Sequence, residues 1–333
     1  MAAMARMDVT ETFHHIKFCG HLHTQESLRF AQNFDFLDSD ILIATYPKSG
    51  TTWMQQIVSL LLSNGNPQLV ETIPNWARAP WLEQYYFKDL CRVLQSPRIL
   101  STHLPYEILA PALQGSRTKV INVIRNPKDA AVSYYFFHKM ANFLPDYSTF
   151  DEFLNSFLDG TVHYGSWFDH VKGWEGNAKN LNIFYITYEE LFQDLGGSLE
   201  KISHFLECSL LPEELSSVQR NSTFGSMKDN SMVNYTLIPN NIMDHSKGQF
   251  MRQGKIGDWK HHFTSKQNTK FNDVFNINKQ LETVMYGRPF IPACTPTPPS
   301  GALPAAWKCS KEQQGIMDIG VFMHSPAGYH GGH

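Results

Sequence analysis

The sequence has few cysteines and no long hydrophobic segment. Its 333 residues include five cysteines, which are far apart and contain no Cys-x-x-Cys pair. This usage argues against a disulfide framework and is typical of reduced thiols in a cytosolic protein. The first 18 residues lack an apolar core of signal-peptide length, and the apolar run near Leu60 is too short to span a bilayer. We therefore expect a cytoplasmic protein that does not enter a membrane.

Concentrated charge is also missing. The formal net charge is −3, the isoelectric point is near 6.6, and no run of five basic residues occurs. This balance gives no overall attraction to nucleic acid or to anionic membranes, so neither is an expected partner. Four histidines precede residue 24, but Cys19 is their one neighbour at the spacing of a metal ligand. We expect no metal site.

The pattern along the chain suggests three parts. Residues 1–35 are weakly patterned and are predicted to form a solvated arm that closes over the fold. Residues 36–285 alternate between strand-like and helix-like segments, which predicts an α/β domain. Residues 286–333 are rich in proline, glycine and alanine, which predicts a disordered tail. No internal repeat is evident.

The segment from Ile41 to Trp53 organises the rest of the chain. The apolar run Ile41–Ala44 predicts a buried strand, Tyr46–Gly50 a tight turn, and the apolar spacing after Trp53 a helix. This order makes an anion site, because the first N–H groups of a helix lack internal partners and the helix dipole adds positive charge there. Further donors in and after the turn are Lys48, Ser49, Thr51 and Thr52.

This turn differs from the P-loop of nucleoside triphosphatases, Gly-x4-Gly-Lys-Ser/Thr. Aligned on Gly50, the P-loop lysine falls on Thr51, and the lysine of this chain lies upstream at Lys48. The strand predicted at 119–124 is followed by Arg125, where such enzymes usually carry an aspartate that binds Mg²⁺. A cation at that position favours direct binding of an anion over a bridging metal.

Residues 98–105 predict a short strand that ends at His103, just before a proline. Open α/β sheets bind ligands at such strand ends, so His103 is a candidate functional residue. The aromatic-rich residues 68–95 show little periodicity and are interrupted by Pro74 and Pro80. They suggest a loop that forms one wall of an apolar pocket.

Residues 119–133 again predict a strand, a turn and a helix, with an asparagine N-cap followed by proline. Arg125 could pair with Asp129 inside this turn, but the neighbouring glycine turn favours a role in anion binding. Residues 181–188 predict a third strand, and Ser198 is the expected cap of the helix that follows it.

The loop Tyr-Pro-Lys-Ser-Gly-Thr-Thr-Trp53 and the segment Phe250–Lys260 resemble the cytosolic sulfotransferases. The runs Met232–Leu237 and Ile242–Ser246 also resemble the phenol- and amine-conjugating branches of that family. Matching motifs follow the family order over roughly residues 35–280, which places a sulfotransferase domain at 36–285. The resemblance implies an α/β, P-loop-like fold with a central, mostly parallel sheet and helices on both faces. It also implies PAPS (3′-phosphoadenosine 5′-phosphosulfate) as sulfuryl donor and PAP as product, without a metal.

The resemblance also assigns roles to residues. His103 matches the catalytic base, and Lys48 matches the lysine that stabilises charge on the departing phosphate. The expected cofactor-binding residues are Lys48, Ser49, Gly50, Thr51, Thr52, Trp53, Arg125, Ser133, Tyr188, Ser222, Thr223, Phe224, Met227, Phe250, Met251, Arg252, Gln253 and Gly254. The expected acceptor-binding residues are Ser101, Thr102, His103, Phe137 and Tyr164.

Some positions depart from the family pattern. Ser101 and Gln253 stand where the family carries lysines, so we expect a changed rate or acceptor choice and weaker cofactor binding. The family's dimer segment is altered at Ser265 and Thr269, which makes a homodimer formed through that segment doubtful.

Three functions follow from these observations. The first is transfer of the sulfuryl group of PAPS to a hydroxyl or amine of a small apolar phenol, alcohol or amine, with His103 as general base. The second is a PAP- or PAPS-binding protein with little or no catalysis, which the substitutions at Ser101 and Gln253 would support. The third is a kinase with a degenerate P-loop, which would require Mg²⁺ and ATP.

Overall fold

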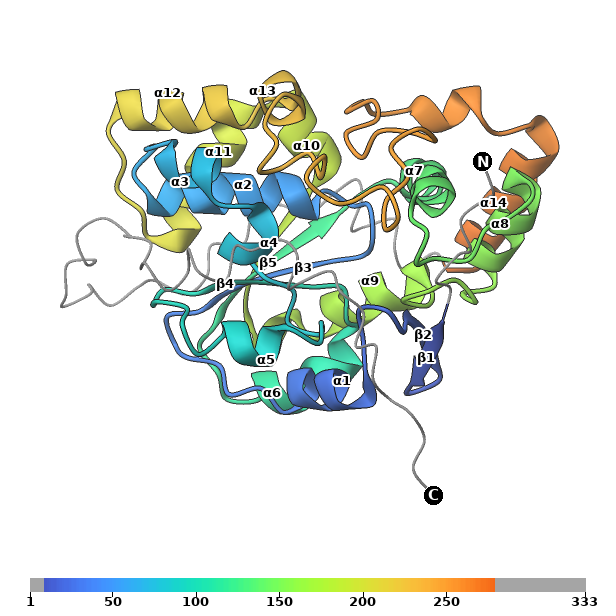
Figure 1. Ribbon diagram of the computed structural model, residues 1–333, viewed down its shortest axis with the longest axis horizontal. Helices are drawn as coiled ribbons and strands as arrows, with labels where there is room; N and C mark the ends of the chain where they lie inside the picture. The colour runs from blue at the N-terminus through green and yellow to red at the C-terminus, as the bar shows by residue number, and fades with distance from the viewer. Residues whose placement is uncertain (1–8, 279–333) are drawn as a thin grey trace.

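The structure, a computed structural model, describes residues 9–278. The strands are β1 (Thr10–Phe13), β2 (Ile16–Cys19), β3 (Ile41–Thr45), β4 (Ile99–Thr102), β5 (Lys119–Ile124) and β6 (Asn182–Thr187). The last four form a central parallel sheet in the order β4–β3–β5–β6, and β1 and β2 form a separate antiparallel hairpin (Figure 1). The predicted tail, residues 286–333, lies outside the described residues.

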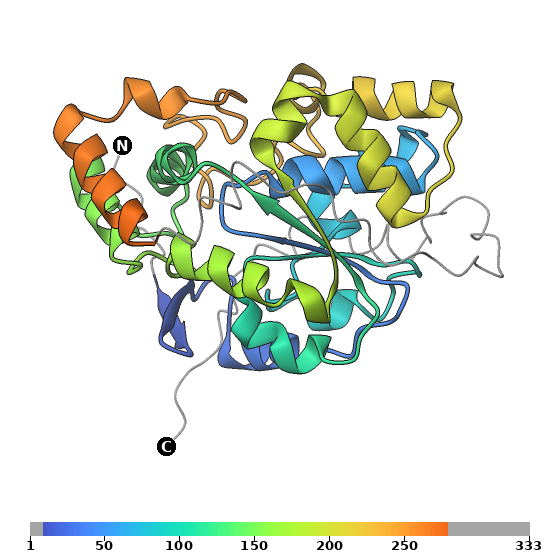
Figure 2. The same ribbon diagram turned by 180° about the vertical axis from the view of Figure 1, so that it is seen from behind.

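Helices cover both faces of the central sheet. They are α1 (Gln25–Gln32), α2 (Thr51–Leu62), α3 (Gln68–Thr72), α4 (Asn75–Arg78), α5 (Phe87–Leu90), α6 (Tyr106–Leu113), α7 (Pro127–Met140), α8 (Phe150–Leu158), α9 (Trp167–Gly176), α10 (Tyr188–Gln193), α11 (Leu195–Leu206), α12 (Pro212–Asn221), α13 (Phe224–Lys228) and α14 (Ser265–Ile277), with 3-10 turns η1 (Ala178–Asn180) and η2 (Asp258–His261). α2, α10, α11 and α12 pack on one face, and α1, α6 and α9 pack on the other (Figure 2). The predicted fold class is confirmed.

The sheet is built around β3, whose first four residues are a continuous apolar run. All of β3 is buried, and it pairs in parallel with β4 on one side and β5 on the other. Parallel strands that are covered on both faces have unbroken hydrophobic sequences. The sequence of β3 therefore suits a central position in the sheet. The carboxyl ends of the four strands lead into Tyr46, His103, Arg125 and Tyr188. The predicted site segments therefore meet at one edge of the sheet.

Helix starts follow from local hydrogen bonding. The Asn126 side chain accepts a backbone N–H of the first turn of α7, and Pro127 occupies that turn, as predicted. The cap of α11 differs, because Asp194 caps this helix and Leu195 begins it. The predicted cap at Ser198 is therefore wrong, and Ser198 is buried inside the helix.

The described N-terminal residues belong to the core. The hairpin, α1 and the segment after α1 contribute buried side chains to the cluster that contains α6 and α9, namely Phe13, Phe18, Leu28, Ala31, Phe34 and Phe36. The prediction of a solvated arm over residues 1–35 is therefore wrong for its described part. Strands of four residues are too short to show a clear periodicity, so the sequence pattern did not reveal the hairpin.

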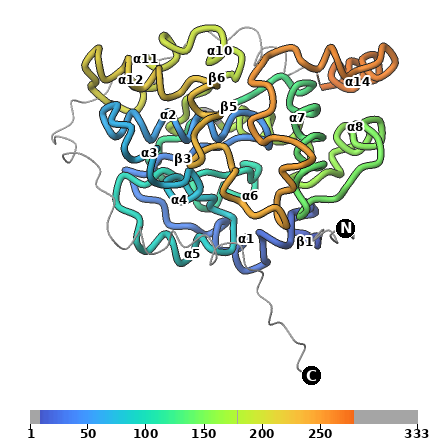
Figure 3. The backbone as a smooth tube through the Cα atoms, turned by 45° about the horizontal axis from the view of Figure 1, so that its top comes forward, coloured from blue at the N-terminus to red at the C-terminus, as the bar shows by residue number. Residues whose placement is uncertain are grey.

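A long connection without regular strands links α13 to η2 and α14 and crosses the carboxyl edge of the sheet (Figure 3). The Met232 carbonyl accepts the Asn75 N–H at the start of α4, and the Ile242 carbonyl accepts the Asn142 N–H just after α7. The connection is thus attached on both sides of the carboxyl edge of the sheet. Within residues 9–278, no helix is long and apolar enough to cross a membrane.

Candidate active site

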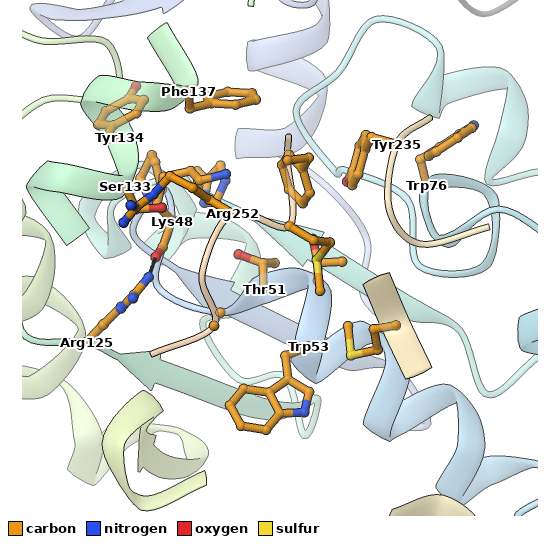
Figure 4. A pocket seen from close by; sticks show the side chains of 18 of the residues that line it. Lys48, Thr51, Trp53, Trp76, Arg125, Ser133, Tyr134, Phe137, Tyr235 and Arg252 are labelled. Carbon is orange, nitrogen blue, oxygen red and sulfur yellow. Dashed lines mark hydrogen bonds between the residues drawn. The ribbon is translucent and has the colours of Figure 1, made fainter. Parts of the chain in front are cut away.

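A cavity of about 410 Å³ opens at the carboxyl edge of the sheet. Small-molecule sites are commonly of this size. Figure 4 shows Arg125 and Trp53 on one side of the cavity and Trp76 and Tyr235 on the other. The predicted site residues that line it are Lys48, Gly50, Thr51, Thr52, Trp53, His103, Arg125, Ser133, Phe137, Tyr164, Tyr188, Thr223, Phe224, Met227, Phe250, Met251, Arg252, Gln253 and Gly254.

The turn between β3 and α2 presents open donors to this cavity. Gly50 precedes α2 with φ 109°, and no side chain caps the helix. The first N–H groups of α2 are therefore free to bind an anion. A Cβ atom at Gly50 would lie 3.0 Å from the Tyr188 ring, so the turn also requires a small residue. The hydroxyl of Ser49 is buried and has no hydrogen-bond partner among the described residues.

The Lys48 amine is held in an apolar environment. Its Nζ lies 4.3 Å from the centre of the Phe137 ring and 3.8 Å from that of Phe250. Burial lowers the pKa of Lys48 to about 7, and the positive charges of Arg125 and Arg252 add to this effect. An anion bound beside the amine would restore its positive charge.

Arg125 is oriented by the backbone. Its guanidinium donates to the carbonyl of Lys48 at 2.9 Å and to that of Lys255 at 3.3 Å, and it lies over the Tyr188 ring. Asp129 instead accepts the N–H groups of Gly257 and Trp259. The alternative pairing of Arg125 with Asp129 is therefore wrong, and the Nε of Arg125 has no hydrogen-bond partner in the described chain.

Arg252 carries the second guanidinium of the site. It forms an ion pair with Asp258 and lies over the Phe136 ring, and its Nε is buried without a hydrogen-bond partner in residues 9–278. The Asp258 carboxylate also lies 3.2 Å from the His262 ring. Asp258 thus aligns Arg252 and partly offsets its charge.

Three aromatic rings gather beyond the cations. The Trp53 and Tyr188 rings meet edge to face at 5.3 Å, and the indole N–H of Trp53 donates to the Ser222 carbonyl. Phe224 begins α13 and packs against Gly254. Such faces are suited to stacking on a flat heterocycle.

His103 follows β4, and its imidazole orientation is fixed. Nδ1 lies 2.7 Å from the Thr45 carbonyl, which can only accept, so Nδ1 carries a hydrogen and Nε2 keeps its lone pair. Trp81 and Tyr164 pack against the ring. Burial lowers the pKa of His103 to about 3, with further contributions from His170, His23 and Lys48. The free imidazole is therefore neutral at physiological pH.

The other wall of the cavity is apolar. It includes the predicted loop wall, because Trp76, Trp81 and Tyr86 line it. Phe137 contributes from α7, and Tyr164 lies in the turn before α9. A flat apolar molecule with one polar group would match this end of the cavity.

Four predicted site residues do not line the cavity: Ser49, Ser101, Thr102 and Ser222. Ser101 is buried with its hydroxyl bonded to Gln55 and to the Ala79 carbonyl, and the Thr102 hydroxyl accepts the Leu104 N–H. The expectation that these two side chains contact an acceptor is therefore wrong. The partners of Ser101, Gln55 and Ala79, lie far from it in the sequence, so the motif by itself did not reveal these contacts.

Comparisons with known proteins agree with this geometry. The sequence model of the sulfotransferase domain matches residues 38–286. The chain belongs to the sulfotransferase family. Sulfotransferase 2B1 of Mus musculus is 48% identical over 263 residues, which are 78% of this chain and 77% of that protein. The 3-alpha-hydroxysteroid sulfotransferase of Cavia porcellus is 40% identical over 269 residues, which are 80% of this chain and 93% of that protein.

Solved structures add to the family assignment. Mouse sulfotransferase SULT7A1, whose crystal structure is a complex with PAP, is 32% identical to this sulfotransferase. The two match with a TM-score of 0.69 over 83% of this chain and 97% of that chain. A retinol dehydratase complex has a TM-score of 0.71 at 21% identity, which shows the shared fold.

The structure also reveals residues that the sequence analysis of this sulfotransferase missed. Leu191, Phe192 and Leu195 line the cavity from α10 and α11, and Glu83 is fully buried behind His103. No signal in the sequence singles out Glu83, because residues 68–95 also contain the carboxylates of Glu71 and Asp89. The three apolar residues look like ordinary helix-core positions in the sequence.

A Gly254→Ala substitution is expected to weaken binding of PAP by about tenfold or more. A Cβ at this position would lie 2.1 Å from the Phe224 ring, and φ is +59°, so the loop or the ring must move. Isothermal titration with PAP measures the change. Gly225→Ala is the matched control, because nothing lies within 4 Å of its Cβ. Equal affinities of the two variants would contradict the packing argument.

Proposed function

We propose that this sulfotransferase transfers the sulfuryl group of PAPS to the hydroxyl of a small, flat, apolar alcohol of steroid-like shape. The observation that supports it is one cavity in which Lys48 and the open N-terminus of α2 lie opposite an aromatic wall, with His103 on the lining. The cationic end suits a phosphate-bearing donor, and the aromatic end suits the acceptor.

The residues present fit PAPS. Two guanidinium Nε groups on the lining of the cavity, from Arg125 and Arg252, are buried without partners in the described part of the chain. Buried donors are normally satisfied, so these two point to an anionic ligand with several oxygens. Arg125, Ser133 and Arg252 would hold the 3′-phosphate, and the turn from Lys48 to Thr52 would hold the 5′-phosphosulfate.

The nucleoside would lie among the aromatic residues. Trp53, Tyr188 and Phe224 would contact the adenine, with Thr223, Met227 and the backbone of Gly254 nearby. Phe250, Met251 and Gln253 complete this side of the cavity. Gln253 carries no charge, which is the reason to expect weaker binding than with a lysine there.

The chain's own groups would then promote transfer. PAPS supplies an activated sulfuryl group, which passes to the acceptor oxygen as PAP leaves. Nε2 of His103 takes the acceptor's proton, because Thr45 keeps the hydrogen on Nδ1. Lys48 and the N–H groups at the start of α2 stabilise the charge that develops on the departing phosphate oxygen. Phe137 and Tyr164 would align the acceptor.

The proposed class of acceptor rests on the apolar wall of the cavity and on the names of the related proteins. The side of the cavity opposite Arg125 carries the rings of Trp76 and Tyr235 (Figure 4). Two of the relatives have names that specify hydroxysteroids. Phenols and amines, the other acceptors expected from the sequence, would also place one polar group near His103.

Transfer of ³⁵S from labelled PAPS tests this function. We expect the highest kcat/KM with a 3-hydroxysteroid, lower values with a simple phenol or an aromatic amine, and no transfer of ³²P from ATP in the presence of Mg²⁺. PAP binding without turnover would instead support the binding-protein alternative. A preference for phenol or amine would overturn the steroid-like acceptor while leaving sulfuryl transfer intact.

We also propose a cellular location and an oligomeric state. We propose a cytoplasmic location, which is consistent with the cysteine usage of the sequence. Thr264 caps α14, and Ser265 and Thr269 lie in its first half. The altered positions of the dimer segment therefore lie on a helix, and we propose that no stable homodimer forms through this segment, which sedimentation experiments test.

A further inference from the structure

Glu83 is a buried carboxyl group that the mechanism above does not use. It is fully buried in the loop between α4 and α5. One oxygen accepts the backbone N–H of His103 at 2.8 Å, and the side chain of Thr102 also bonds to the carboxyl group. The other oxygen, Oε2, has no hydrogen-bond partner among residues 9–278. A carboxyl group without an arginine or lysine partner is costly to bury, so its presence requires a reason.

The hydrogen bonds that Glu83 accepts from other residues come from the segment that carries His103. The ring of His170 hydrogen-bonds the backbone of His103, and the Thr45 carbonyl holds Nδ1 of its ring. His103 is thus held by three buried groups. Glu83 bonds its backbone N–H, His170 bonds another part of its backbone, and Thr45 bonds its ring. Of these three contacts, only the one from Glu83 can bring a negative charge.

Sulfuryl transfer creates a need for the negative charge of Glu83. As the acceptor O–H bond breaks, its proton joins Nε2 of His103, the acceptor oxygen bonds to sulfur, and the bond from sulfur to the PAP oxygen breaks with its electrons going to PAP. His103 becomes a cation in a buried position where Lys48, His23 and His170 already disfavour positive charge. A nearby carboxylate offsets this cost because it favours the protonated imidazole.

We infer that Glu83 is a positioning residue for the transfer, whose carboxylate fixes the backbone of His103 and offsets the positive charge that the imidazole gains. The inference rests on the proposed role of His103 as general base. Glu83 exchanges no proton with the substrates in the step. Its absence from the lining of the cavity agrees with a role exercised through His103.

The titratable groups around Glu83 determine how this role shows in a pH profile. Tyr86 and Tyr164 face the carboxyl group, and both have pKa values raised well above 10.0, chiefly by burial, so they stay neutral. Burial also lowers the pKa values of His23 and His170, to about 4 and about 3. Burial raises the pKa of Glu83 to about 7, so Glu83 takes up a proton before His103 does as the pH falls.

The test is Glu83→Gln, which keeps an acceptor oxygen for the His103 N–H and removes the charge. We expect kcat for ³⁵S transfer to fall by about tenfold to a hundredfold, the affinity for PAP to stay within about twofold, and the acidic limb of kcat to move to lower pH. A merely structural role would lower the melting temperature and leave the acidic limb in place. An unchanged kcat with an unchanged limb would overturn the inference.

Two further variants complete the test. Glu83→Asp keeps the charge on a shorter side chain and is expected to keep the acidic limb and part of the rate. If Glu83→Gln fails to fold, loss of the acidic limb in Glu83→Asp would overturn the inference. Glu200→Gln, on the exposed face of α11, is the matched control and should behave as the wild type. If the wild type itself transfers no sulfuryl group, the proposed function fails; if only the Glu83 effect is missing, the inference alone fails.

Discussion

Replacing His103 by alanine should lower sulfuryl transfer by about a hundredfold to ten-thousandfold and leave PAP binding nearly unchanged. The acceptor hydroxyl is a poor nucleophile until its proton is removed, and Nε2 of His103 is the unprotonated nitrogen on the cavity wall. The cations that would hold PAP are on other segments, so the donor site should survive. Single-turnover transfer of ³⁵S and titration with PAP measure the two effects separately.

A matched pair of variants sharpens this experiment. His103→Asn keeps a side-chain N–H that can donate to the Thr45 carbonyl but offers no basic nitrogen, so it should be as inactive as alanine. His204→Ala, an exposed position on α11, should retain full activity. Turnover by His103→Ala at the wild-type rate would remove His103 from the mechanism.

Lys48→Met should lower kcat by about a hundredfold or more, because it removes the cation beside the departing phosphate. Methionine has a similar length and would remain between Phe137 and Phe250, so the apolar packing is kept. Stopped-flow measurement of transfer separates this loss from the smaller expected loss of PAPS affinity. Lys201→Met, on the exposed face of α11, serves as the control.

The same residue predicts an alkaline limb in the pH profile. Lysine is charged below its pKa, and the pKa of Lys48 in the free enzyme is about 7 because of burial and the two arginines. Since kcat/KM reports the free enzyme, its value for PAPS should fall as the pH rises above about 7. Lys48→Arg stays charged and should move this limb to higher pH. A profile that is flat up to pH 9 in the wild type would contradict this assignment.

The sequence predicted the strands of the central sheet and the turns that follow them well, for a physical reason. Signals such as Asn126 followed by Pro127, or Gly50 before α2, act through hydrogen bonds and φ angles within a few residues. Such local requirements are written in consecutive residues. The same reasoning failed where two candidate cap residues lie close together in the sequence. Asp194 caps α11, and the predicted cap, Ser198, does not.

Side-chain direction was less predictable. The resemblance assigned Ser101 and Thr102 to the acceptor, but their hydroxyls bond elsewhere in the buried sheet. The described residues before position 36 have a weak pattern, yet Phe18 and Leu28 belong to the core. In each case the outcome depends on which other segment packs against the residue, information that a single stretch of sequence does not contain.

By itself, then, the sequence determined the α/β class, the glycine-containing turn at Lys48–Thr52 and the strand ends that carry His103 and Arg125, because each rests on neighbouring residues. Tertiary structure alone decided the charge state and surroundings of those groups. Phe137 and Phe250 desolvate Lys48, and Glu83 reaches the backbone of His103, although these partners are distant in sequence. Burial and electrostatic coupling depend on distance in space, which only the folded chain defines.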